Sequence, residues 1–322
     1  MDPFAVLVVV GILSGEYVIV IVGVIVFLLA RRRARRGAAD GGTQPIFRRG
    51  VLIAVGVLGF AANLLFLLPL TPLPMDLPED VPYARGPLEV LPAWAEYALV
   101  PAVGAITQLI FVLAAARWVR RSRGLARGLD PRPRRWWSFL PRGTMAAGVT
   151  LVVLTCLTVV AAGVAATTDS RGRSTLIQIT TPGGYGATLF PGWYYTVPVI
   201  AGTIVLVIFA GAALALIARP PSVNDQTDSD RRRAASHVGL AALAFLAMTL
   251  GRLWIFAALG GVGMAEVTTD EGSAWIVTSF QALTPVLGLA GASLVGAGLA
   301  ACALLIVPAR ARSKPPVEAG TP

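Results

Sequence analysis

Residues 5–30 read AVLVVVGILSGEYVIVIVGVIVFLLA, and residues 31–36 read RRRARR. The apolar stretch contains one charged residue, Glu16. At about 1.5 Å per residue it is long enough to cross a hydrocarbon core of roughly 30 Å as a tilted helix. Basic residues that flank a span stay on the cytoplasmic side of a membrane. The stretch therefore predicts a membrane-spanning helix whose N-terminus lies outside the cell.

The composition of the whole chain agrees with this interpretation. Of its 322 residues, 56% are hydrophobic, and the mean hydropathy of +0.73 is far above that of a soluble domain. The net charge is +10, but the basic residues lie in short segments between apolar runs, which is typical of membrane flanks. We expect a multi-pass membrane protein whose arginines contact anionic lipid head groups and which binds no nucleic acid.

Seven apolar runs organise the chain. The spans are expected at residues 5–30, 51–70, 93–119, 145–167, 197–218, 237–261 and 281–307. All but four of the 27 basic residues then fall on one side of the membrane, the exceptions being Arg85, Arg171, Arg173 and Arg252. The sequence thus predicts an all-α polytopic bundle of seven transmembrane helices over 1–307, with the N-terminus outside and a disordered cytoplasmic tail over 308–322.

The loops carry three further predictions. In the outer loop 168–191, the strand-like run 174–181 and the segment 187–190 flank a Pro-Gly-rich turn, which indicates a β-hairpin lid. The polar cytoplasmic loop 220–230 is expected to be disordered. A tryptophan is expected to open each of three helices that run inward from the outer surface, because Trp prefers the interface. These residues are Trp94, Trp193 and Trp275.

Four polar residues fall inside the predicted spans, where ionisable groups are costly and indicate a functional site. They are Glu16, Asn63, Gln108 and Arg252. Their positions along the spans place all four within a slab about 10 Å thick. We predict that Glu16 faces Arg252 and that Asn63 or Gln108 completes the hydrogen bonding. A structural clamp between helices is favoured over a substrate or proton site, and both interpretations stay open.

The last span carries a stripe of small residues, Gly288, Ala292 and Gly296. Small residues at this spacing let two membrane helices approach closely and gain van der Waals contact. The stripe therefore predicts a packed helix pair. It gives no information about which helix is the partner.

Several chemistries are excluded by the residues themselves. Bis-histidine haem needs two ligands, and His237 is the only histidine. A retinal Schiff base needs a lysine within the bundle, whereas Lys314, the only lysine, lies in the tail. The chain contains no HExxH, Walker-type or CxxC motif. We therefore expect no enzymatic activity, no cofactor and no metal site.

The outer segment Phe190-Pro191-Gly192-Trp193-Tyr194-Tyr195, the Ala/Gly/Val-rich spans and the arginine-only cytoplasmic loops resemble those of multi-span integral membrane proteins of actinobacteria. The resemblance implies a bacterial plasma membrane, and that group brings no assigned chemistry. We expect a non-enzymatic accessory, assembly or sensing component that acts with other membrane subunits. The alternative is a small-solute transporter or permease subunit with its polar site near the midplane.

Overall fold

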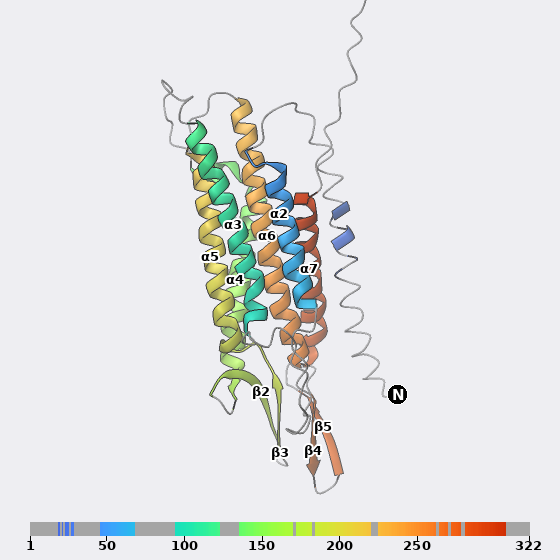
Figure 1. Ribbon diagram of the computed structural model, residues 1–322. Helices are drawn as coiled ribbons and strands as arrows, with labels where there is room; N and C mark the ends of the chain where they lie inside the picture. The colour runs from blue at the N-terminus through green and yellow to red at the C-terminus, as the bar shows by residue number, and fades with distance from the viewer. Residues whose placement is uncertain are drawn as a thin grey trace, which may run out of the picture.

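The computed structural model is mostly helical (Figure 1). It describes residues 46–67, 94–122, 135–169, 172–181, 184–219, 225–261, 264–269, 272–277 and 281–306, together with residues 19, 21, 23–25, 27 and 28. Most of the predicted first span and all of the predicted tail 308–322 lie outside these residues.

Helices account for most of the described chain. Their bounds are α2 Arg49–Leu67, α3 Trp94–Ser122, α4 Arg142–Ala165, α5 Trp193–Ala218, α6 Asp225–Gly261 and α7 Thr284–Ile306, with short 3-10 helices η2 Trp136–Phe139 and η3 Gln281–Leu283. Five of them, α3 to α7, contain apolar stretches long enough to cross a membrane. Their sequences are apolar around most of the helix circumference, which is typical of helices with lipid or protein on every side.

Two small antiparallel sheets lie at one end of the helical bundle (Figure 1). The first contains β1 Thr167–Thr168, β2 Ser174–Thr181 and β3 Gly184–Leu189, and the second contains β4 Met264–Thr269 and β5 Gly272–Val277. Strands β2 and β3 form the predicted hairpin, which is confirmed with Thr181 paired to Gly184 at its tip. The second hairpin was not predicted, so a purely all-α description is too narrow.

The helix starts confirm some of the predictions and correct others. Trp94 and Trp193 open α3 and α5. Trp275 lies in β5 instead, so the prediction of a third helix-opening tryptophan is wrong. Helix α7 begins nine residues later at Thr284, with Pro285 in its first turn, where the missing N–H of proline costs nothing.

The loop 220–230, which was expected to be disordered, is partly helical. Helix α6 begins at Asp225, so the prediction for 220–230 is wrong over its second half. Asp228 lies near the N-terminus of α6, where negative charge is stabilised by the helix dipole. Tertiary packing adds to this local preference, because Arg231 one turn further on is fully buried.

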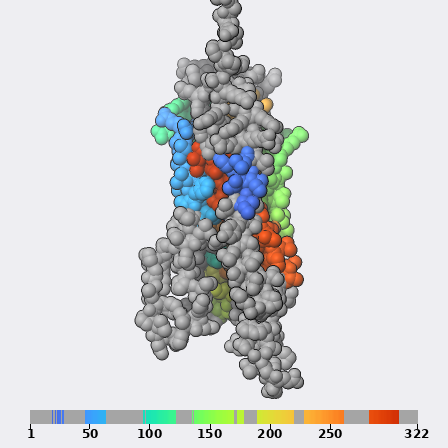
Figure 2. Space-filling view, turned by 90° about the vertical axis from the view of Figure 1, so that its right-hand side faces the viewer, coloured from blue at the N-terminus to red at the C-terminus, as the bar shows by residue number. Residues whose placement is uncertain are grey.

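Helix α6 is the centre of the bundle and contacts each of α2, α3, α4, α5 and α7. Its tightest neighbour is α7: a Cβ added to Gly251 would lie 2.5 Å from the carbonyl oxygen of Gly291, so only glycine permits this approach. On the other side of α7, a Cβ on Gly23 would lie 3.2 Å from the carbonyl oxygen of Gly296. Figure 2 shows the described residues between 19 and 28 lying against this face.

Candidate functional site

Arg252 of α6 forms the main polar contact inside the bundle. Its guanidinium Nη2 donates to the side-chain Oδ1 of Asn63 at 2.6 Å and to the backbone carbonyl oxygen of Asn63 at 3.0 Å. Arg252 is 3% exposed and Asn63 is 4% exposed. A buried guanidinium needs directed oxygen acceptors, and Asn63 on α2 supplies two. The contact fixes α2 against α6.

Three aromatic rings from three helices pack together on the hairpin side of this contact. The ring of Tyr97 stacks on that of Phe256 with centroids 4.4 Å apart, and Tyr195 meets both edge-on at 5.4 and 5.2 Å. Phe256 lies one helical turn beyond Arg252 and therefore shares its face of α6. The three rings therefore pack together at the hairpin end, next to the turn of α6 that carries Arg252.

A further set of contacts joins the hairpin to these rings. The carboxylate of Asp169 accepts hydrogen bonds at 2.8 Å from the backbone N–H and from Nε of Arg173. This partner raises the pKa of Arg173 above its ordinary value. The guanidinium of Arg173 lies 5.0 Å from the ring centroid of Tyr194, which in turn meets Tyr195 at 5.2 Å. The base of β2 is therefore connected by direct contacts to the start of α5.

Gln108 lies in a different layer of the bundle from Arg252. Its fully buried amide Nε2 donates to the backbone carbonyl oxygen of Val238 at 3.3 Å. Val238 and Arg252 are separated on α6 by a rise of roughly 20 Å. The expected single slab is therefore wrong for Gln108, because sequence alone does not fix how far α3 is displaced along α6.

The other predicted residues are placed as follows. Glu16 lies outside the described residues, so its pairing with Arg252 stays a prediction. Within the stripe, Ala292 and Gly296 are buried, and a Cβ on Gly288 would lie an ordinary 3.8 Å from that of Ala258. Gly296 faces Ile19 and Gly23, whereas the closest approach to α6 is made one position before Ala292, at Gly291.

Arg231 is a buried arginine that the sequence did not reveal. It is 0% exposed and lies over the rings of Trp118 and Phe139, with its carbon Cζ 5.7 and 5.8 Å from their centroids. Its Nη1 lies 3.9 Å from Oδ1 of Asp228. Its position in a run of three arginines suggested a solvated membrane flank. The one signal of this burial in the sequence was Asp228, an acidic residue three positions earlier.

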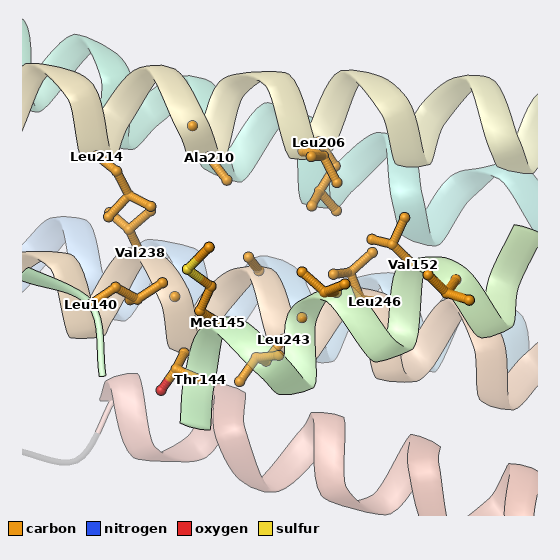
Figure 3. A pocket seen from close by; sticks show the side chains of 17 residues that line it. Leu140, Thr144, Met145, Val152, Leu206, Ala210, Leu214, Val238, Leu243 and Leu246 are labelled. Atoms are coloured by element: carbon orange, nitrogen blue, oxygen red, sulfur yellow. The ribbon is translucent and has the colours of Figure 1, made fainter. Parts of the chain in front are cut away.

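An apolar groove lies between α4 and α5 on the face of α6 (Figure 3). Its volume is about 260 Å³, and Thr144 supplies the only polar side chain of its lining. Asn63, Gln108 and Arg252 do not line it. Figure 3 shows side chains of Leu214, Met145 and Leu246 pointing into the space between the helices.

The arrangement can fix helices and connect the hairpin to the interior. Within the described residues, no group of three or more His, Cys, Asp or Glu side chains is placed to hold a metal ion. The free thiols Cys156 and Cys302 lie in different helices. Searches of protein-family models, curated proteins and solved structures find nothing that matches this chain.

Proposed function

We propose that the protein is a non-enzymatic membrane component of the sensing or accessory class, in which the outer hairpin reports its state to the interior of the bundle. The observation that carries this proposal is the series of contacts from hairpin to buried charge. Arg173 contacts Tyr194, Tyr194 contacts Tyr195, and Tyr195 packs with Tyr97 and Phe256. Phe256 lies one helical turn from Arg252, which bonds Asn63 of α2.

The proposal includes a topology. Seven spans, with residues 5–30 as the first, place the N-terminus and both hairpins outside a bacterial plasma membrane and the tail 308–322 in the cytoplasm. It is supported by five helices of membrane-spanning length and by the arginines of the described helix ends opposite the hairpins, such as Arg49, Arg121 and Arg142. The partners proposed are anionic lipids at the arginine-rich face and other membrane subunits at the hairpins.

The transport alternative rests on one specific observation, the buried charge of Arg252. A charge at membrane depth marks substrate pathways in many transporters. The ring contacts that join the start of α5 to α6 near Arg252 favour the sensing proposal over transport. Flux measurements separate the two functions.

The proposed coupling is tested by hydrogen exchange of the full-length protein in lipid nanodiscs. Arg173→Ala and Tyr194→Ala remove the first contacts of the series and leave Arg252 untouched. We expect the amides of α6 around Arg252 to exchange several-fold faster in both variants, because local protection follows local packing. The matched control is Trp137→Ala, which removes the ring beneath Arg135 at the opposite end of the molecule.

Exchange around Arg252 that is unchanged in both hairpin variants would overturn the coupling. Proteoliposomes give the second readout, with labelled amino acids, sugars and monovalent cations as probes. We expect no flux above that of empty liposomes. Flux through the wild-type protein that disappears in Arg252→Gln would establish transport instead.

A further inference from the structure

The α4–α5 groove is formed because two helices diverge toward the arginine-rich end. At their hairpin end they touch, since a Cβ on Gly163 of α4 would lie 2.3 Å from the indole of Trp193 on α5. Toward the other end, a Cβ on Gly211 of α5 would meet no atom within 4 Å. The space between them is bounded by 144–153 of α4 and 206–214 of α5, and α6 forms its floor over 238–246 (Figure 3).

The dimensions of the groove indicate what kind of molecule it could bind. The α4 wall rises by about 14 Å, which is close to one leaflet of a hydrocarbon core of roughly 30 Å. The groove volume of about 260 Å³ extends along the helices over this length. The groove therefore suits an extended hydrocarbon chain that lies parallel to the helices.

The charge at the mouth of the groove indicates the head group. Arg142 opens α4 between Leu140 and Thr144, which both line the groove, and its side chain is exposed. Arg219 caps α5 just beyond the lining residue Leu214 and is also exposed. The positive end of the α4 dipole lies at the same place. An exposed arginine at the end of each of the two helices that bound the groove is complementary to a phosphate that carries an acyl chain.

We infer that the α4–α5 groove binds one anionic phospholipid of the cytoplasmic leaflet. One acyl chain lies along the groove, and the phosphate lies between Arg142 and Arg219. The inference rests on the proposed topology, which puts the arginine-rich end in the cytoplasm. It does not depend on the sensing role. Trp137 on η2 is 40% exposed and lies three residues before the lining residue Leu140 in sequence. An exposed tryptophan at this position is typical of the depth of the membrane interface.

Native mass spectrometry of the full-length protein in a neutral detergent tests this site. The probes are phosphatidylglycerol and phosphatidylcholine with identical acyl chains. We expect one retained phosphatidylglycerol per chain, with about tenfold or greater preference over phosphatidylcholine. Arg142→Gln and Arg219→Gln should each lower phosphatidylglycerol affinity about fivefold and phosphatidylcholine affinity less, because choline already balances the phosphate charge of that lipid. Arg232→Gln, an exposed arginine on α6, is the control and should change neither.

Gly211→Leu tests the apolar part, because its side chain enters open space without meeting the core. We expect it to abolish retention of both lipids. Ala201→Leu, at an exposed position on the same helix outside the groove, should retain them. Equal binding of the two lipids would overturn the inference, as would full retention in Gly211→Leu. A dimer without lipid that is lost in Gly211→Leu would assign the groove to a second copy.

A thiol-labelling experiment separates this inference from the proposed topology. Arg232→Cys is introduced into a Cys156→Ser, Cys302→Ala background and exposed to an impermeant maleimide in whole cells. The expected result is no labelling. Labelling would overturn the topology and the assignment to the cytoplasmic leaflet, while selective lipid retention would still show a lipid site. Absent labelling together with unselective retention would overturn the lipid inference alone.

Discussion

Two buried arginines on the same helix contact different kinds of partner. Arg252 donates to two oxygens of Asn63 at 2.6 and 3.0 Å. Arg231 lies between the aromatic rings of Trp118 and Phe139, with Asp228 at 3.9 Å. About 32 Å of helix separates them, so they occupy opposite ends of α6. Each is less than 5% exposed.

The difference shows what each residue can do. Hydrogen bonds to the amide and carbonyl of Asn63 are directional and short, so a displacement of α2 relative to α6 breaks them. Aromatic faces hold a cation over a broad range of positions, so Arg231 tolerates small shifts of its neighbours. We infer that the Arg252 end of α6 responds to movement and that the Arg231 end anchors the helix.

The largest loss of stability is expected when the directional hydrogen bonds of Arg252 are removed. Arg252→Ala removes a large buried side chain and leaves the Asn63 side-chain oxygen without this donor, so we expect the free energy of unfolding to fall by about 3–5 kcal/mol. Denaturation of the protein in mixed micelles measures this change. Arg252→Lys is the control and should recover part of the loss, since one ammonium donor still reaches Oδ1. A loss under about 1 kcal/mol would show that the Asn63 contact does not hold α2.

Removing Arg231, at the anchoring end of α6, should lower the free energy of unfolding by less. Arg231→Ala empties the space between Trp118 and Phe139, and we expect a destabilisation of about 2–3 kcal/mol from lost cation–π contact and packing. The neighbouring Arg232 is exposed, so Arg232→Ala should change stability by no more than about 0.5 kcal/mol. The same micelle denaturation checks both. Equal effects of the two variants would contradict the burial of Arg231.

A double-mutant cycle sharpens the comparison. Combining Arg231→Ala with Trp118→Leu should give a coupling free energy of about 1 kcal/mol, because only the cation–π part is shared between the two residues. The cycle of Arg252→Ala with Asn63→Ala should give a larger coupling, about 1.5–3 kcal/mol, as charged hydrogen bonds do. A larger coupling in the Arg231 cycle would reverse the roles assigned to the two ends.

Local signals predicted several features that the structure confirms. The starts of α3 at Trp94 and of α5 at Trp193 follow from the interfacial preference of tryptophan. The β2–β3 hairpin follows from a strand-like run followed by a Pro-Gly turn. Each of these features depends on residues that are close in sequence.

Features set by packing between distant segments were missed. The burial of Arg231 depends on Trp118 and Phe139, which lie about a hundred residues away in sequence. The layer occupied by Gln108 depends on how far α3 is displaced along α6. Gly291, and not a residue of the predicted stripe, makes the closest approach to α6, and this depends on the rotation of α7 about its axis. A single sequence carries no direct measure of rotation, displacement or partner.

The smallest expected effect lies at the hairpin, in the ion pair of Arg173 and Asp169. The Arg173 side chain is 39% exposed, so Arg173→Ala should lower the free energy of unfolding by less than about 1 kcal/mol, and salt should reduce the difference further. Asp169 raises the pKa of Arg173. Stability from a raised basic pKa is lost only as pH rises through that pKa, so Arg173 should contribute equally between about pH 6 and pH 10. Denaturation at several pH and salt values measures this. If exchange around Arg252 nevertheless quickens in Arg173→Ala, the hairpin contact transmits a change without stabilising the fold, as the sensing proposal requires.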